Sequence, residues 1–106
     1  MDTLRWSLAH ADDGSVHLGV AGDIDLDSRD QFDLALSEAV AAAGDSVTVD
    51  LSEVAFMSSE GVNSLVRARR LAHRHAVDVT VVAPTSCVRL VLSVMGAGDL
   101  LAEGSR

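Results

Sequence analysis

The hydrophobic period of this sequence changes in a regular order along the chain, and that order limits the folds available to it. Apolar and polar residues alternate over Leu4–Leu8 and again over Val16–Val20, which is typical of half-buried strands. Asp12-Asp13-Gly14-Ser15 lies between them and favours a hairpin turn. From Ser28 to Ala43 the apolar residues follow the i, i+3, i+4, i+7 spacing of one helix face.

The second half of the chain continues this alternation of strands and helices. Ser46–Leu51 is rich in β-branched residues and predicts a strand, as does Val77–Val82. A helix is expected from Ser58 or Ser59 to about His73, and a last one from Pro84-Thr85-Ser86 to Gly96. The predicted order is β-β-α-β-α-β-α. It indicates an α/β fold with a mixed β-sheet, parallel where helices form the crossovers, and with helices packed on it.

The ends of the first helix carry recognisable capping residues. Asp27 or Ser28 is expected to cap its start, because short polar side chains accept hydrogen bonds from the first free N–H groups. Gly44 is expected to end it, since glycine adopts the left-handed conformation common after a helix.

Size and charge narrow the classes of partner. The 106 residues suit one domain, residues 1–106, without a separate catalytic or regulatory domain. The net charge is −8 and the chain has no Lys, which argues against nucleic acid and anionic membranes as partners. Apolar runs are too short to span a bilayer, no leader is recognised, and the single Cys87 suits a reducing compartment. We therefore expect a cytoplasmic protein.

Metal, cofactor and catalytic patterns are incomplete. Asp23–Asp27 begins like a calcium loop, but Ser28 and Leu34 occupy the positions that need Gly and Glu. His73 and His75 are two residues apart, which does not place them together on one helix face. The segment Ser58-Ser59-Glu60-Gly61 lacks the glycine of a nucleophile elbow. No metal, no cofactor and no enzymatic activity are expected.

The second predicted helix carries a basic stripe. Asn63, Arg67, Arg70 and Arg74 follow one another at i, i+4, i+7 and i+11, so they share one exposed side. Cations are favoured near a helix C-terminus, so a solvated surface explains the stripe. A basic docking strip on an otherwise acidic protein explains it as well.

Two motifs carry the information on function. The segment 47–62 is a buried strand with Asp50-Leu51-Ser52 at its end, a short apolar loop, and paired serines that open a helix. A second motif, Gly22-Asp23-Ile24-Asp25, follows the second strand. Together with the element order and the C-terminal Val94-Met95-Gly96, they closely resemble the STAS domain family of bacterial anti-sigma factor antagonists. The resemblance covers nearly the whole chain.

The resemblance implies a function and a phosphoacceptor. The family's phosphorylated serine falls on Ser59. In the family, the unphosphorylated antagonist binds an anti-sigma factor, often a Ser/Thr kinase, and so releases a sigma factor. Phosphorylation by that kinase ends the complex, and a phosphatase restores the antagonist. The expected partners are thus an anti-sigma factor and a phosphatase, with no nucleic acid and no membrane.

The partner-binding surface is expected around the acceptor. Its residues are Asp23, Asp25, Ser58, Glu60, Gly61, Val62, Asn63 and Arg67. Gly61 is expected to keep the first turn slim for an approaching backbone, and Val62 to supply apolar contact. Ser58 and Glu60 depart from the family's usual Asp and small residue. These departures motivate an alternative, a STAS interaction or scaffold module that is not phosphorylated, in a regulatory or lipid-transport complex.

Overall fold

The computed structural model describes residues 4–102, and within them the predicted order of strands and helices is confirmed. The elements are β1 (Arg5–His10), β2 (Ser15–Ala21), α1 (Arg29–Ala42), β3 (Ser46–Glu53), α2 (Ser59–His73), β4 (Asp78–Val82) and α3 (Ser86–Val94). A short 3-10 helix, η1 (Gly98–Leu100), follows α3 and was not predicted.

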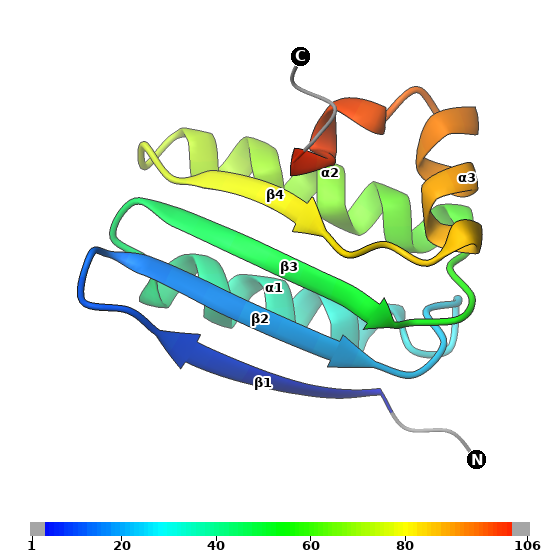
Figure 1. Ribbon diagram of the computed structural model, residues 1–106, viewed down its shortest axis with the longest axis horizontal. Coiled ribbons are helices and arrows are strands. Elements are labelled where there is room, and N and C mark those ends of the chain that lie inside the picture. Colours follow the sequence, from blue (N-terminus) through cyan, green and yellow to red (C-terminus); the bar gives the residue numbers. More distant parts are fainter. Residues whose placement is uncertain (1–3, 103–106) are drawn as a thin grey trace.

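The four strands form one mixed sheet in the order β1-β2-β3-β4. β1 runs antiparallel to β2, while β2, β3 and β4 run parallel to one another. The parallel pairs are joined by α1 and α2, as the crossover rule requires. Figure 1 shows α1 and α2 on one side of the sheet, with α3 standing near the carboxyl ends of the parallel strands. The mixed sheet and its helical crossovers are as predicted.

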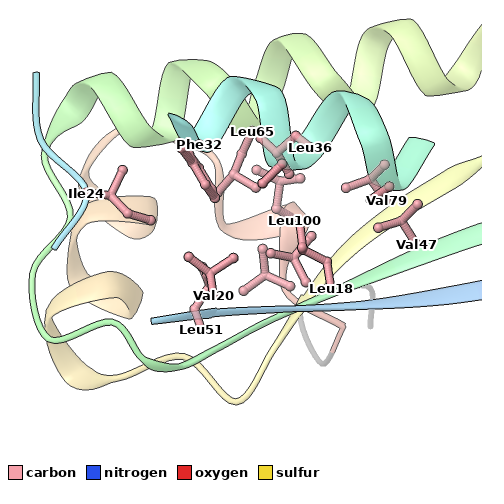
Figure 2. Close-up of a cluster of buried hydrophobic side chains, with 14 of the residues drawn as sticks. Leu18, Val20, Ile24, Phe32, Leu36, Val47, Leu51, Leu65, Val79 and Leu100 are labelled. Atoms are coloured by element: carbon pink, nitrogen blue, oxygen red, sulfur yellow. The ribbon is translucent and has the colours of Figure 1, made fainter. Parts of the chain in front are cut away.

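The core lies between the sheet and the two long helices. Alternate residues of the central strands are buried there, namely Val16, Leu18, Val20, Val47, Val49 and Leu51. Phe32 and Leu36 of α1 and Leu65 of α2 pack onto them (Figure 2). Full burial of one such side chain stabilises the fold by about 1.5–3 kcal/mol. This packing fixes both helices, and therefore both helix starts, relative to the strands.

The predicted ends of α1 need correction. Ala43, in an extended conformation, ends the helix, and Gly44 is not a left-handed cap. Gly44 instead donates its N–H to the carbonyl oxygen of Gly14 at 2.8 Å, where a side chain would press on the Gly14 backbone. Ser28 occupies the N-cap position but its hydroxyl does not bond to the helix. Local spacing predicted the helix; contacts with other segments decide its ends.

No helix within residues 4–102 is long and apolar enough to cross a membrane.

Candidate functional site

The two sequence motifs lie side by side at the carboxyl ends of β2 and β3. The N–H of Gly22 donates to the carbonyl oxygen of Glu53 at 3.2 Å, and Ile24 donates to Phe56 at 2.9 Å. Ser58 in turn donates to Ile24 at 2.8 Å, and Ile24 and Met57 form a parallel bridge. We call the segments 22–25 and 53–58 the paired loops. They hold the start of α2 beside the loop that precedes α1.

The two serines at the start of α2 have different environments. Ser58 is half-buried and is the N-cap, with its Oγ accepting the N–H of Glu60 at 3.3 Å. Ser59 is the first helical residue and is exposed. Its hydroxyl forms no hydrogen bond with any other residue of the described chain. The cap is therefore supplied by one serine, and the next serine presents a free hydroxyl to solvent.

Gly61 and Val62, which were expected to lie at the partner surface, lie inside the domain. Both residues are buried. A Cβ on Gly61 would lie 2.7 Å from Met57 Cγ and 2.8 Å from Ile24 Cγ2. The close approach that needs glycine is therefore internal, between α2 and the paired loops. Val62, only 1% exposed, belongs to the core and has no side-chain surface to offer a partner.

Acidic side chains lie on both sides of the helix start. Asp23 is exposed, whereas Asp25 is half-buried and its carboxylate accepts the N–H of Ser28 at 3.1 Å. Glu60 Oε1 lies 3.5 Å from Nη1 of Arg29, the first residue of α1. Asp23 thus stays exposed to solvent, Asp25 supports the loop, and Glu60 connects the two helix starts.

The two expected contact residues farther along α2 also differ. Asn63 is exposed, four residues after Ser59. Arg67 donates to Asp33 of α1 at 3.2 Å while 56% of its side chain stays exposed. The Arg67–Asp33 pair therefore fastens α2 to α1, in a position that sequence spacing did not indicate.

Two large apolar residues that the sequence motifs did not indicate are exposed in the loops at this edge of the sheet. Phe56 in the loop between β3 and α2 is 47% exposed, and Leu26 in the loop between β2 and α1 is 65% exposed. Phe56 belongs to the paired loops, and Leu26 follows the segment 22–25 directly in sequence. In the sequence, Phe56 lies two residues before Ser58, and this proximity could have indicated that Phe56 belongs to the site.

Three cavities in the described part of the chain lie elsewhere. One of about 240 Å³ is on the open face of the sheet, between β1 and the end of β3. Two more, of about 190 and 420 Å³, lie between α1 and α2. None of the three is lined by Ser58 or Ser59. Nor do three His, Cys, Asp or Glu residues of the described chain gather where they would hold a metal ion. The serine pair thus lies on the surface, outside these three cavities.

Comparison with known proteins decides the family. The family model described as "Mlab, STAS domain" matches residues 7–102. The chain belongs to the STAS domain family. The resemblance found in its motifs is thereby confirmed. Among curated proteins, no relative matches this sequence.

Solved structures agree with the STAS fold. An anti-sigma factor antagonist from Mycobacterium paratuberculosis superposes with a TM-score of 0.82 at 22% identity, covering 94% of this chain and 84% of the other. The antagonist SpoIIAA in its unphosphorylated form gives 0.77 at 21% identity, covering 92% and 85%. A STAS-domain antisigma-factor antagonist from Rhodobacter sphaeroides gives 0.65 at 21% identity, covering 76% and 87%. At these identities the likeness establishes the fold alone.

Proposed function

We propose that this STAS domain is an anti-sigma factor antagonist. It binds an anti-sigma factor of the Ser/Thr kinase type and thereby releases a sigma factor in the cytoplasm. Phosphorylation of Ser59 by the kinase ends the complex, and a phosphatase restores it. The observation that carries the proposal is the exposed, unbonded hydroxyl of Ser59 on a helix start that Ser58 already caps.

The helix start tolerates a phosphate at Ser59. Free N–H groups and the helix dipole favour an anion at the N-terminus of a helix. The phosphate adds about −1.5 to −2 charges and needs no rearrangement of the core, because Ser59 is outside it. The modified domain therefore keeps its fold, and the effect of phosphorylation falls on the interface.

The same phosphate is costly inside a complex. Phe56, three residues before Ser59, and Leu26, directly after the paired segment 22–25, are exposed apolar side chains, and they support a partner surface with apolar contacts from which water is excluded on binding. A dianion enclosed there without a countercharge loses its hydration. A penalty of about 2.8 kcal/mol weakens binding about a hundredfold. A single covalent change thus switches the antagonist off while the domain stays folded.

The proposal is tested by measuring affinity for the kinase-type anti-sigma factor encoded in the source genome. Ser59→Ala is expected to bind within a few-fold of wild type, and Ser59→Asp about tenfold or more weaker, since its carboxylate is enclosed without a partner. Ser37→Asp is the matched control, because Ser37 is exposed on α1. Equal affinities for Ser59→Asp and Ser37→Asp would reject the mechanism.

Two observations favour a second function. Glu60 already places a carboxylate beside Ser59 and is held by Arg29, and the matching family model is described as Mlab. A STAS module that stays bound in a larger complex without phosphorylation fits these facts. Incubation with the kinase and ATP, followed by intact-mass measurement, separates the two functions. One phosphate, lost in Ser59→Ala, supports the switch, and an unmodified chain supports the constitutive module.

A further inference from the structure

The exposed side of α2 is divided by charge. Its N-terminal end lies beside acids, among them Asp23 and Glu60, whereas Arg70 and Arg74 are exposed near its C-terminal end. Neither arginine forms an ion pair with any residue between 4 and 102. By contrast, Arg69 of the same helix lies 3.1 Å from Asp99. We call Arg70 and Arg74 the arginine pair.

Two unneutralised cations are notable in a chain with 16 acidic and 8 basic residues. Like charges at i and i+4 on a helix repel by a few tenths of a kcal/mol. The residues on either side of Arg74 are the exposed His73 and His75, so neither sequence neighbour supplies a negative charge to Arg74. The dipole at the C-terminal end of α2 makes the pair compatible with the fold, but it leaves their charge available to another molecule.

The arginine pair and Ser59 face the same side of α2. Residues advance by about 100° around a helix, so an interval of eleven residues brings Arg70 back to within about 20° of Ser59. Asn63 and Arg74 are separated by the same interval. At about 1.5 Å per residue, Arg70 lies about 17 Å along the helix from Ser59. A standard interface buries about 800 Å² on each partner, which is about 30 Å across and large enough to cover both.

We propose that the arginine pair is a second contact for the same anti-sigma factor, which presents acidic side chains opposite it. This inference rests on the proposed function. The order of charges along α2, acidic near Ser59 and basic near Arg74, fixes the direction in which the partner docks, since the reversed orientation would oppose like charges. Nucleic acid is the weaker occupant, because two arginines on a protein of net charge −8 neutralise few phosphates.

The test is the association rate constant with the purified anti-sigma factor at about 50 and 200 mM NaCl. Charges at the edge of an interface act mainly on association and on its salt dependence. Arg70→Glu and Arg74→Glu are compared with Arg5→Glu, which changes the net charge equally. Arg5 is exposed on β1, at the sheet edge opposite β4. Arg70→Gln removes the charge without reversing it, and circular dichroism checks that every variant is folded.

The expected result is a rate about tenfold lower for Arg70→Glu and Arg74→Glu than for Arg5→Glu at low salt, with a smaller difference at high salt. Arg70→Gln is expected to fall between. Equal rates for all three Glu variants overturn the inference, while a remaining effect of Ser59→Asp leaves the proposed function standing. Failure of the wild type to bind overturns both. Tight binding of a 30-base-pair DNA duplex that Arg70→Glu abolishes assigns the pair to nucleic acid and also overturns it.

Discussion

The two long helices begin in similar places but are started in different ways. Each follows a parallel strand, and each has a serine at its N-cap. Ser28 is 7% exposed and its hydroxyl donates to the carbonyl oxygen of Asp23 at 2.8 Å and accepts the N–H of Asp25 at 3.0 Å. Ser58 accepts one N–H at 3.3 Å, and the helix behind it is held by the close approach of Gly61 to the paired loops.

The same edge of the sheet therefore holds a serine that fixes a loop, Ser28, and a serine whose hydroxyl is exposed, Ser59. Hydrogen bonds of Ser28 lock the loop before α1, and that loop holds the loop before α2 through Ile24. Because backbone fit and a single cap suffice for α2, the hydroxyl of Ser59 is not needed by the structure. The Ser59 hydroxyl is exposed and has no hydrogen-bond partner within residues 4–102.

The largest loss of stability is expected for a substitution at Gly61, which packs α2 against the paired loops. Gly61→Ala is expected to lower the free energy of unfolding by about 2 kcal/mol, because the new methyl group overlaps Met57 and Ile24. Urea denaturation measures the loss. Gly98→Ala is the control, since a Cβ there meets nothing within 4 Å, and its effect is expected to stay within about 0.5 kcal/mol. Equal stability of the two variants would mean that α2 does not pack on the paired loops as described.

Ser28→Ala tests the lock at the other helix start. The change removes two hydrogen bonds of a buried hydroxyl and is expected to cost about 1.5 kcal/mol in urea denaturation. Hydrogen exchange of the Asp25 amide, which loses its acceptor, is expected to accelerate. An unchanged exchange rate at Asp25 would show that the hydroxyl does not hold this loop.

Substitutions of Ser58 and Ser59 are expected to differ from each other in stability, by less than the effects above. Ser58→Ala is expected to destabilise the protein by about 1 kcal/mol, because the cap of α2 is lost. Ser59→Ala is expected to change stability by less than about 0.5 kcal/mol, since its hydroxyl has no partner in the described structure. Thermal unfolding of the two variants in one buffer makes the comparison. A larger loss of stability for Ser59→Ala than for Ser58→Ala would show that Ser59, and not Ser58, caps α2.

Asp50 provides the smallest effect and lies outside both helix starts. Hydrogen bonds from Ser52, with a smaller contribution from nearby His17, lower the pKa of the Asp50 carboxyl from its usual 3.8. A lowered folded-state pKa stabilises the fold above the unfolded-state value and is lost as the pH falls through the folded-state value. Asp50→Asn is therefore expected to cost about 0.5 kcal/mol at pH 7. In urea titrations its difference from wild type is expected to shrink below about pH 4; a constant difference would contradict this.

Much of the fold was predictable because it depends on periodicity within each segment. Alternation over Val16–Val20 and the apolar face of 28–43 place buried residues where the structure has them. The end of α1 was not predictable, because Gly44 is used by the hairpin turn at Gly14, a contact between distant segments. The ion pair between Arg67 and Asp33 could not be predicted from sequence spacing either, because it also joins distant segments of the chain.

The candidate site was predictable in its location but not in the role of every residue. The motifs placed Asp23 and Ser59 at one edge of the sheet, and both are exposed there. Gly61 was expected to face a partner, although it lies four residues before Leu65 and so shares the buried helix face. The four-residue spacing from Leu65 already indicated that Gly61 faces the core, and it was a better guide to this position than the general use of glycine near a ligand.

The most direct test of the proposed switch is the dissociation constant of the Ser59-phosphorylated domain for the proposed anti-sigma factor partner, measured beside that of the unmodified domain. The phosphorylated form is expected to bind more weakly by about a hundredfold or more, because the phosphate cannot be hydrated in the interface. Equal dissociation constants for the two forms would contradict this prediction.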